Sequence, residues 1–350
     1  MKRKKILINT PYLKDHGGVV NHFLGLKPYW SADVRYNVIG KRSKWNGSGV
    51  LFLPYDIIKF VLKLLWWRPD AILLNPSLNK SAVTRDMIFL GIGVLLKVKT
   101  YVMFHGWRPD YAEIVDKAKL SNKLNRSAGI MVLCSSFKES LISWGVTVPI
   151  FLVTTKVDDR LLSGFDITKS QREKVDKILF LARIEKEKGI FEALKTFEII
   201  HKKYPNKKLI VAGDGSALAE AKMMVKKKNL ANVFFLGYLH GDDLKRQFID
   251  CDVYLFTSYH EGMPTSVLEA MAFGLPVITS SVGGLVDFFE NEKMGRIIEK
   301  LDPELFANEI ENLICHPEKV KNISRYNHEY AQAHFFASEV AKGMEKIILG

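Results

Sequence analysis

The first half of the chain alternates short apolar runs with longer segments in which apolar residues recur at helical spacing. KKILINT, AILLN, KTYVMF and GIMVLCSS have the length of strands, whereas GGVVNHFLGL, YDIIKFVLKLLWW, SAVTRDMIFLGIGVLLKV and FKESLISWGV are typical of helices. Continuous apolar strands separated by helices favour a parallel sheet that is covered on both faces.

The alternation stops after IFLVTTKVD and begins again about twenty residues later. The stretch DRLLSGFDITKSQREKVD (159–176) is polar, has no strand pattern and could connect two domains. KILFLARI, KKLIVAGDG, NVFFLGYL, VYLFTS and LPVITSS then alternate with helical segments, and the chain is helical and polar from about Asp302. We predict an α/β protein with domains over 1–160 and 161–330, and a last helix in 331–350 that could pack back on the first domain.

Composition narrows the class of protein. The 350 residues are 47% hydrophobic and 25% charged, as in ordinary globular proteins. The longest apolar run, MIFLGIGVLL (87–96), is too short to span a membrane, and the apolar part of MKRKKILINTPY is too short for a signal peptide. Three widely separated cysteines give neither a disulfide framework nor a metal spacing, so we expect a cytoplasmic protein.

Positive charge is concentrated in the first half. Residues 1–155 hold 23 Lys and Arg against 9 Asp and Glu, a net charge of +14, whereas residues 156–350 hold 28 against 29. Such a patch favours a polyanion or an anionic membrane surface, although a solvated basic face without a partner has the same composition. No segment resembles a zinc finger or another nucleic-acid-binding motif, so binding to nucleic acid is the weaker hypothesis.

Ligands of open parallel sheets bind beyond the carboxyl ends of the strands. Gly17 and Gly18 follow the first strand and precede a helix, which suits an approaching anion but also a plain loop. Gly213 lies in GDG after another strand, where a phosphate turn and a tight turn are both possible. His105 follows TYVMF and is a candidate proton carrier or hydroxyl ligand, although a lone histidine is more often structural.

Two cations indicate an anion-binding site more strongly than these glycines and His105 do. Arg183 and Lys188 follow the strand KILFLA and precede a helix. At that position they could hold a diphosphate. The alternative is a solvated loop in which Glu185 and Glu187 neutralise both charges.

The stretch HEGMPTSVLEAMAFGLPVITSSVGG, from His260 to Gly284, contains two carboxylates. Pro264 suits the first position of a helix, which places Glu261 in the loop before it and Glu269 inside it. A carboxylate on an apolar helix needs hydrogen bonds or a counter-charge. Sugar hydroxyls could supply the hydrogen bonds, and a buried Arg or Lys is the plainer alternative.

ARIEKEKG, VAGDG, FLGYL and EGMPTSVLEAMAFGLPVITSSVGGLVDFF occur in this order. Together they resemble the C-terminal domain of retaining glycosyltransferases of the GT-B fold, family 4, also called group 1. The resemblance is strong over 177–300. Before that it rests on GGVVNHF, FHGW and the order of strands and helices. Thr155 and Lys156 stand where many relatives carry Asn and Gly.

The resemblance implies two Rossmann-like, doubly wound domains that face a cleft, with the nucleotide-sugar donor on the second and the acceptor on the first. Arg183 and Lys188 match the pair that holds the diphosphate, and Glu269 matches the ribose ligand. Glu261 and His105 match residues near the reacting sugar and are the catalytic candidates. The further donor-binding positions are Gly17, Gly18, Gly213, Tyr238, Leu239, Gly262, Met263, Pro264, Thr265 and Ser266.

The resemblance also implies a retaining, metal-independent hexosyltransferase without a cofactor, in which cationic side chains and helix N-termini carry the leaving-group charge. The expected product is a surface polysaccharide, lipopolysaccharide or glycolipid, built on a glycan or polyprenyl-diphosphate-linked acceptor. Two alternatives follow. The protein could lie on the inner face of the cytoplasmic membrane, with Trp66 and Trp67 at the interface, or it could act on a soluble acceptor away from the membrane. A nucleotide-sugar epimerase and a non-catalytic nucleotide-sugar-binding subunit are the alternatives.

Overall fold

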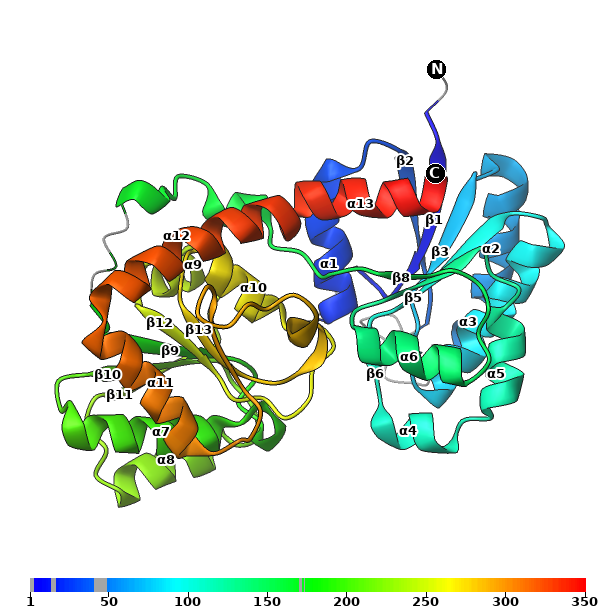
Figure 1. Ribbon diagram of the computed structural model, residues 1–350. Helices are drawn as coiled ribbons and strands as arrows, with labels where there is room; N and C mark the ends of the chain where they lie inside the picture. Colours follow the sequence, from blue (N-terminus) through cyan, green and yellow to red (C-terminus); the bar gives the residue numbers. More distant parts are fainter. Residues whose placement is uncertain (1–2, 14–16, 41–48, 170–171, 173) are drawn as a thin grey trace. The chain divides into compact units, whose positions relative to one another are not determined.

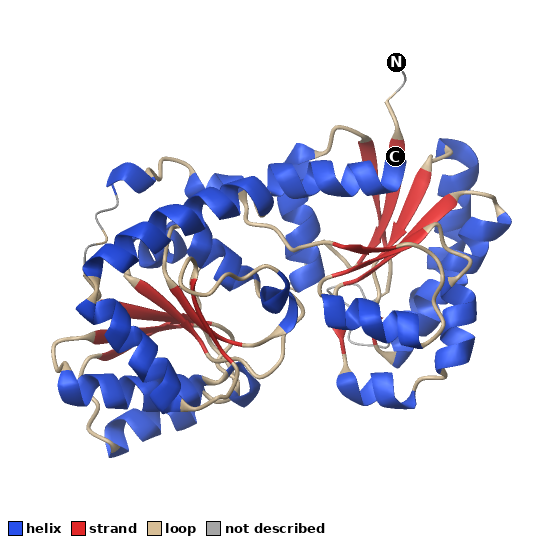
Figure 2. Ribbon diagram, viewed as in Figure 1, coloured by secondary structure: helices blue, strands red, loops and turns tan. Residues whose placement is uncertain are grey.

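The computed structural model describes residues 3–13, 17–40, 49–169, 172 and 174–350. The chain forms two compact units, each with its own sheet and helices (Figures 1 and 2). The first unit consists of residues 1–156 and 337–350, and the second of residues 157–336. We describe each unit by itself.

The first unit is built on a parallel six-stranded sheet whose strand order is β2-β1-β3-β5-β7-β8. The register places Ile6 of β1 beside Val34 of β2 and Ala71 of β3. The inner strands are buried along almost their whole length, as their apolar sequences predict. The strands are β1 (Lys5–Thr10), β2 (Asp33–Val38), β3 (Ala71–Leu74), β5 (Lys99–Phe104), β7 (Gly129–Val132) and β8 (Ile150–Leu152).

Helices cover this sheet and include the last helix of the chain. Phe60 of α2 and Phe89 of α3 pack edge to face in the core, with ring centroids 4.9 Å apart. The carboxylate of Glu345 on α13 accepts hydrogen bonds from Ala32 N at 2.7 Å and Ser31 Oγ at 2.5 Å. The helices are α1 (Gly18–Leu26), α2 (Leu53–Trp67), α3 (Lys80–Leu95), α4 (Pro109–Ile114), α5 (Lys117–Leu124), α6 (Ser135–Ser143) and α13 (Ala337–Leu349). A small sheet pairs β4 (Ser77–Leu78) with β6 (Gly106–Trp107).

The second unit has a parallel six-stranded sheet in the order β11-β10-β9-β12-β13-β14. On one face of the sheet, Phe180 of β9 packs in a core cluster with Phe197 and Phe306 of the covering helices. The strands are β9 (Lys177–Leu181), β10 (Lys208–Ala212), β11 (Val233–Gly237), β12 (Val253–Phe256), β13 (Val277–Ser280) and β14 (Gly295–Ile298).

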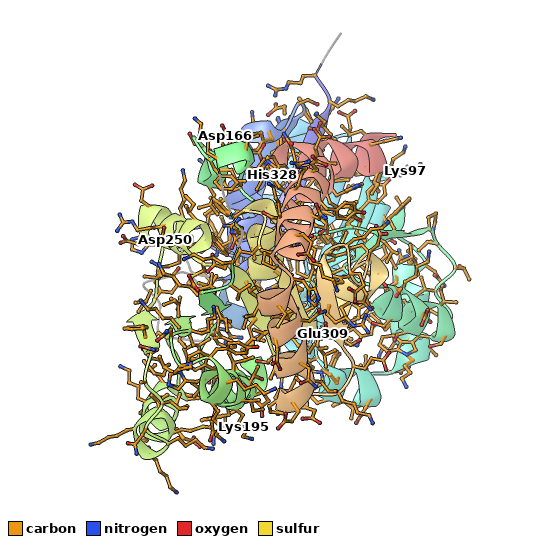
Figure 3. The ribbon with its side chains drawn as sticks, turned by 60° about the vertical axis from the view of Figure 1, so that its left-hand side comes forward. Lys97, Asp166, Lys195, Asp250, Glu309 and His328 are labelled. Atoms are coloured by element: carbon orange, nitrogen blue, oxygen red, sulfur yellow. The ribbon has the colours of Figure 1, made fainter. Side chains whose placement is uncertain are left out.

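The helices of the second unit bury one face and turn charged side chains outward, as Lys195 on α7 and Glu309 on α11 illustrate (Figure 3). His328 Nδ1 on α12 lies 2.6 Å from Ala272 O, which ties α12 to the end of α10. The helices are α7 (Ile190–Lys203), α8 (Leu218–Lys227), α9 (Gly241–Asp250), α10 (Thr265–Ala272), α11 (Pro303–Cys315) and α12 (Pro317–His334).

The polar stretch 159–176 belongs to the second unit, and Arg172 anchors it there. The buried Arg172 guanidinium donates to Cys251 O at 3.1 Å, to Phe248 O at 2.6 Å and to Phe273 O. These carbonyls lie at the ends of α9 and α10, where helices leave such groups without intrahelical partners. The stretch is therefore tied to the unit through Arg172 and is more than a polar connector.

The predicted α/β class with two doubly wound parallel sheets is confirmed. The edge strands β2 and β14 and the helices α4 and α5 are elements that the apolar pattern did not predict. The structure describes all three cysteines, and no disulfide joins them. Over the described ranges, every helix is too short or too polar to cross a bilayer.

Candidate functional site

In the sheet of the second unit, the direction in which successive strands are added reverses between β9 and β12. From β9 the strands run through β10 to β11 on one side, and from β12 through β13 to β14 on the other. Ligands of open α/β sheets bind at such a switch point, beyond the carboxyl ends of the strands. Tyr259 N donates to Glu187 O at 2.9 Å, and Thr257 Oγ1 to Gly189 O at 2.7 Å, so the loops after β9 and β12 are held together there.

Lys188 and Glu261 meet at this point. Lys188 Nζ lies 2.5 Å from Glu261 Oε1, and their side chains are only 17% and 16% exposed. Ser258 Oγ donates to the same carboxylate oxygen at 2.9 Å. The left-handed Gly189 (φ +74°) makes this possible, because a Cβ there would lie 1.8 Å from Thr257 O. Two candidates taken from distant motifs thus form one ion pair.

Arg183 follows the same strand and is exposed. Among the described residues its guanidinium makes no hydrogen bond. Glu185, which could have neutralised it, accepts from Ser216 N at 3.1 Å and from Ser216 Oγ. These two hydrogen bonds are the main cause of the lowered pKa of Glu185, and the charge of Arg183 contributes less. Arg183 therefore keeps its donors for another anion.

Glu269 lies inside the helix α10, as predicted, and its side chain is partly exposed although its apolar neighbours are buried. It lines a hollow of about 500 Å³ together with residues of 158–163 and the start of α9. Tyr254 lies beneath this region: its hydroxyl donates to Leu181 O at 2.8 Å, and Ser266 also bonds to it. Burial raises the pKa of Tyr254, and the negative charges of Glu269 and Glu261 raise it further.

The start of α10 differs by one residue from the prediction. Pro264 is the N-cap and Thr265 the first helical residue, so Pro264 does not occupy the first helical position. Gly262 O accepts from Gly284 N at 2.7 Å, and a Cβ on Gly283 would lie 2.2 Å from the same oxygen. The closing glycine pair therefore supports the loop that carries Glu261. Met263 is buried beside it, and Ser266 contacts Tyr254 as described.

The other candidates in this unit lie on neighbouring strand ends. Gly213 N donates to Gly237 O at 2.7 Å, and a Cβ on Gly213 would lie 1.9 Å from Ala182 O. The packing of the turn therefore accounts for glycine at position 213 without a ligand. Tyr238 is exposed after β11 and stacks on His240, with ring centroids 6.1 Å apart, and Leu239 beside it is partly exposed.

In the first unit, Gly17 and Gly18 begin α1. A Cβ at either position would meet no described atom within 4 Å, and the φ of Gly17 is 171°, which any residue adopts. No described side chain caps this helix. Packing therefore does not require glycine at these positions, whereas a closely approaching ligand would.

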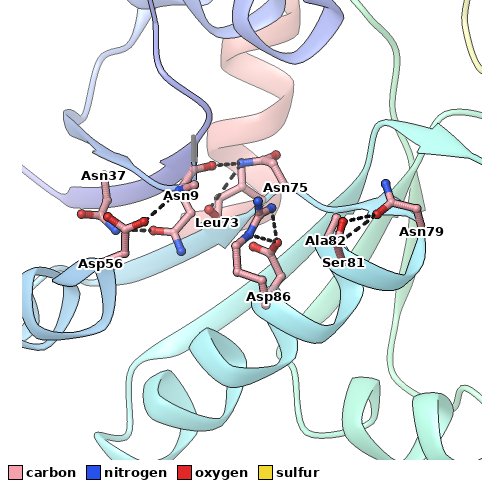
Figure 4. A network of polar contacts seen from close by, with 11 residues as sticks. Asn9, Asn37, Asp56, Leu73, Asn75, Asn79, Ser81, Ala82 and Asp86 are labelled. Carbon is pink, nitrogen blue, oxygen red and sulfur yellow. Dashed lines mark hydrogen bonds and ion pairs between the residues drawn. The ribbon is translucent and has the colours of Figure 1, made fainter. Parts of the chain in front are cut away.

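His105 follows β5 and is held by Asn75, whose other hydrogen bonds, to Asn9 and Leu73, are drawn in Figure 4. Asn75 Nδ2 donates to Asn9 O at 2.8 Å, so its Oδ1 accepts from His105 Nε2 at 3.2 Å. Nε2 then carries the proton, and Nδ1 remains as an acceptor. Desolvation lowers the pKa of His105 to about 3, although the residue as a whole is only partly buried. At neutral pH this histidine is uncharged, which favours a hydroxyl ligand over a cationic acid.

Sequence reasoning passed over His22, whose ring packs against that of His105 with centroids 5.0 Å apart. Its two nitrogens are buried without hydrogen-bond partners in the part of the chain that the structure describes. Burial, then His105 and Lys156, lower the pKa of His22 well below its usual value. Lys156, which replaces the glycine of many relatives, runs past Gly25, where a Cβ would lie 2.1 Å from Lys156 Cε.

Metal-binding clusters are missing from the described ranges: no three His, Cys, Asp or Glu side chains converge there. The charged candidates of this unit are Arg183, Lys188, Glu261 and Glu269, of which Lys188 and Glu261 are paired. An ammonium retains two further donors after one hydrogen bond, and the guanidinium of Arg183 retains its full set. The arrangement can bind a small anion that also presents hydroxyl groups.

Residues 165–330 match the family model described as Glycosyl transferases group 1. Over these 166 of its 350 residues the chain is similar to the group 1 glycosyltransferases. The match contains Arg183, Lys188, Glu261 and Glu269, so the whole candidate site of the second unit lies within it.

Curated relatives agree with this family match. An uncharacterised glycosyltransferase of Methanocaldococcus jannaschii is 32% identical over 156 residues, which are 41% of this chain and 40% of that protein. The capsular polysaccharide biosynthesis glycosyltransferase CapM of Staphylococcus aureus is 31% identical over 164 residues, 46% of this chain and 42% of CapM. The chain thus spans about two fifths of the length of these relatives.

The fold of the chain also resembles a solved structure over almost its full length. Anabaena Alr3699/HepE in complex with UDP-glucose superposes with a TM-score of 0.72 over 98% of each chain, at 18% identity. The two parallel sheets thus match the GT-B arrangement that the sequence predicted.

Sequence reasoning missed Ser258 and Tyr254, which contact the candidate residues Glu261 and Ser266. Both lie in VYLFTS, which was interpreted only as a strand. A tyrosine inside a buried strand and a serine at its end were the available signals, because a buried hydroxyl needs a polar partner.

Proposed function

We propose that the protein transfers a hexose, with retention of anomeric configuration, from a nucleotide sugar to a lipid-linked glycan acceptor. The match to the group 1 glycosyltransferases supports sugar transfer, and the site of the second unit supports a nucleotide diphosphate as the leaving group. The ion pair of Lys188 and Glu261 is the observation that carries the proposal, because it brings the cation proposed to bind phosphate within 2.5 Å of the carboxylate proposed to face the sugar.

In this proposal Lys188 and Arg183 bind the diphosphate. Lys188 holds Glu261 with one donor, so its remaining donors can reach phosphate oxygens while the pair persists. Negative charge develops on the diphosphate as its bond to the sugar breaks. Preorganised cations at a partly buried position stabilise that charge without a large rearrangement. No step then depends on a metal ion.

The carboxylates have separate tasks in the proposed complex. Glu269, beside the 500 Å³ hollow, accepts hydrogen bonds from the ribose hydroxyls. Glu261, which two donors hold in one orientation, lies against the transferred sugar. The acceptor oxygen bonds to the anomeric carbon on the face from which the phosphate oxygen departs. The hydroxyl proton of the acceptor passes to that phosphate oxygen, so no enzyme nucleophile is needed.

The first unit is the proposed acceptor unit. Its net positive charge suits a diphosphate-linked lipid, and neutral His105 offers Nδ1 as an acceptor for a sugar hydroxyl. Gly17 and Gly18 place no side chain at the start of α1, whose backbone N–H groups suit an anion. CapM is named for capsular polysaccharide biosynthesis, and a surface polysaccharide is the product class we propose here.

The test is consumption of nucleotide sugars by the full chain. UDP-, GDP-, ADP- and dTDP-linked hexoses are incubated with wild type and with Lys188→Met, and free nucleotide and sugar are quantified. We expect slow hydrolysis of at least one donor by wild type and none above background by Lys188→Met. Conversion of the donor into an isomeric nucleotide sugar without release of the nucleotide would instead indicate an epimerase.

A further inference from the structure

The outer face of α2 is apolar and exposed. Its side chains recur every three or four residues, as one face of a helix requires, and Trp66 is 85%, Leu51 69% and Ile58 60% exposed. We call this set the α2 stripe; it consists of Leu51, just before the helix, Tyr55, Ile58, Leu62, Leu65 and Trp66.

The opposite face of α2 fixes its orientation. Phe60, Leu64 and Trp67 are buried in the core of the unit. On the flank, Lys59 Nζ donates to Val38 O at 2.9 Å and Lys63 Nζ to Tyr36 O at 3.1 Å. The prediction that both tryptophans face the interface is therefore wrong for Trp67, which packs inward under Arg35. Of the two, only Trp66 points outward.

A basic hollow lies at the C-terminal end of the stripe. It measures about 620 Å³, and Leu65 and Trp66 of the stripe line it together with four cations and one carboxylate. Asp70 Oδ1 lies 3.8 Å from Lys4 Nζ, and Asp70 Oδ2 accepts from Lys5 N at 2.8 Å. One carboxylate cannot neutralise all four cations, so the hollow has a net positive charge. The cations are Arg3, Lys4, Lys5 and Arg68.

The neighbouring helix extends the same surface. α3 packs beside α2 through the Phe60–Phe89 contact, and in Figure 1 the two helices lie together on one side of the sheet. At the C-terminal end of α3, Leu95 is exposed and is followed by Leu96 and Lys97. Apolar side chains with cations at the helix ends thus recur on the adjacent element.

We infer that the α2 stripe docks on the surface of an anionic lipid bilayer, with the basic hollow taking lipid phosphates. Aromatic and aliphatic side chains on one face and cations beside them are the features by which helices lie in a membrane interface. Within α2, whose residues are all described, the one carboxylate is that of Asp56, which is buried. Nucleic acid would be bound by the cations but would leave the apolar stripe without a function.

The orientation suits a lipid-linked acceptor, and to that extent the inference rests on the proposed function. α2 connects parallel strands, so it runs opposite to them and begins at the edge where β1, β3 and β5 end. Its fifteen residues are about 22 Å long. A bilayer along the stripe would therefore reach from the basic hollow to the edge that carries His105, where the headgroup of the acceptor is needed.

The test is co-sedimentation of the full chain with vesicles in the absence of donor. Vesicles of phosphatidylcholine alone and with 30% phosphatidylglycerol are compared at low and high salt, a composition we choose to give a strongly negative surface. We expect binding to the anionic vesicles at low salt and at least a tenfold loss of affinity at high salt, because salt screens charge attraction. A blue shift of tryptophan fluorescence on binding, absent in Trp66→Phe, would report insertion of this side chain.

Variants distinguish vesicle binding by the α2 stripe and the basic hollow from non-specific adsorption of the protein. We expect Ile58→Ser/Leu62→Ser/Trp66→Ser and Lys4→Glu/Arg68→Glu each to lower the affinity at least tenfold. The matched controls on the second unit are Met223→Ser/Val286→Ser/Leu305→Ser and Lys195→Glu/Lys227→Glu, which also change exposed residues and should bind as wild type does.

Three results would overturn the inference. These are equal binding to neutral and anionic vesicles, an equal loss in the controls, and a stripe variant that dissolves a dimer without affecting vesicle binding. The last result would identify the stripe as an interface between copies. Donor hydrolysis in solution does not depend on lipid, so failure of this inference and failure of the proposed function are distinguishable.

Discussion

Lys188 and Glu261 lie 73 positions apart in the sequence and form an ion pair of 2.5 Å at the switch point of the second sheet. Ser258 bonds to the same carboxylate oxygen, so three polar groups fix one another. A substitution of either charged partner therefore alters the other, and single variants at this pair measure more than one lost contact.

Replacement of the cations tests the diphosphate site. We expect Lys188→Met and Arg183→Met each to weaken binding of a nucleoside diphosphate by about 1.5–3 kcal/mol, roughly 10- to 150-fold, because charge-assisted hydrogen bonds are lost. Lys186→Met is the matched control, since Lys186 lies in the same turn but pairs with Glu220 at 2.9 Å. Isothermal titration with free nucleotide measures all three. Wild-type affinity in both site variants would remove the diphosphate from this position.

Substitutions of the two carboxylates should affect different steps, one nucleotide binding and the other turnover. Glu269→Gln preserves size but weakens acceptance from the ribose hydroxyls, so we expect a higher dissociation constant for the nucleoside diphosphate. We expect Glu261→Gln to lower turnover of the nucleotide sugar and to change that constant little. Titration and hydrolysis assays on both variants decide the matter, and the reverse pattern would exchange the two roles.

The buried histidines predict a loss of stability in acid. The pKa values of His22 and His105 are lowered in the folded protein, so between about pH 6.5 and 3 the unfolded chain binds more protons. The free energy of unfolding must therefore fall as the pH falls through this range, by about 1.4 kcal/mol per pH unit for each fully neutral histidine.

His22→Phe should reduce this dependence, because it removes one buried proton acceptor whose nitrogens have no described partner. Urea unfolding between pH 4.5 and 7 measures the slope. His260→Asn, at an exposed position, is the control and should retain the wild-type slope. An unchanged slope in His22→Phe would show that His22 is protonated in the folded protein.

Arg172 should matter for the stability of the second unit. Arg172→Met removes hydrogen bonds to three carbonyls at the ends of α9 and α10, and we expect the protein to lose about 2–4 kcal/mol of stability. Lys174→Met in the same stretch changes an exposed pair with Asp176 and should leave the Tm as in wild type. Equal melting of both variants would mean that the stretch contributes nothing as an anchor.

Much of the fold could be predicted because apolar strands and amphipathic helices leave a clear pattern, as β9 and α7 do. β2 lacked that signal: it is an edge strand whose sequence DVRYNV mixes polar and apolar residues, and only Asn37 in it is fully buried. Such a polar strand is identified only through its pairing with β1, and the periodicity of the sequence does not reveal that pairing.

The candidate site was predictable only in part. Motif spacing identified Lys188 and Glu261 separately, but their ion pair depends on how the loops after β9 and β12 meet, which involves the left-handed Gly189. His22 was overlooked because it lies within an ordinary amphipathic helix, and its burial follows from packing against His105. Long-range contacts of this kind are fixed by the tertiary structure and leave no local pattern.

The most direct test follows donor hydrolysis by NMR with the panel of nucleotide sugars, wild type and the Lys188→Met and Lys186→Met variants. The account predicts that wild type and Lys186→Met consume at least one donor and first release the sugar in the anomeric configuration that it had in the donor. Lys188→Met should release none above background. Absence of binding and consumption for every donor, or first release of the opposite anomer, would contradict a retaining sugar transferase at this site.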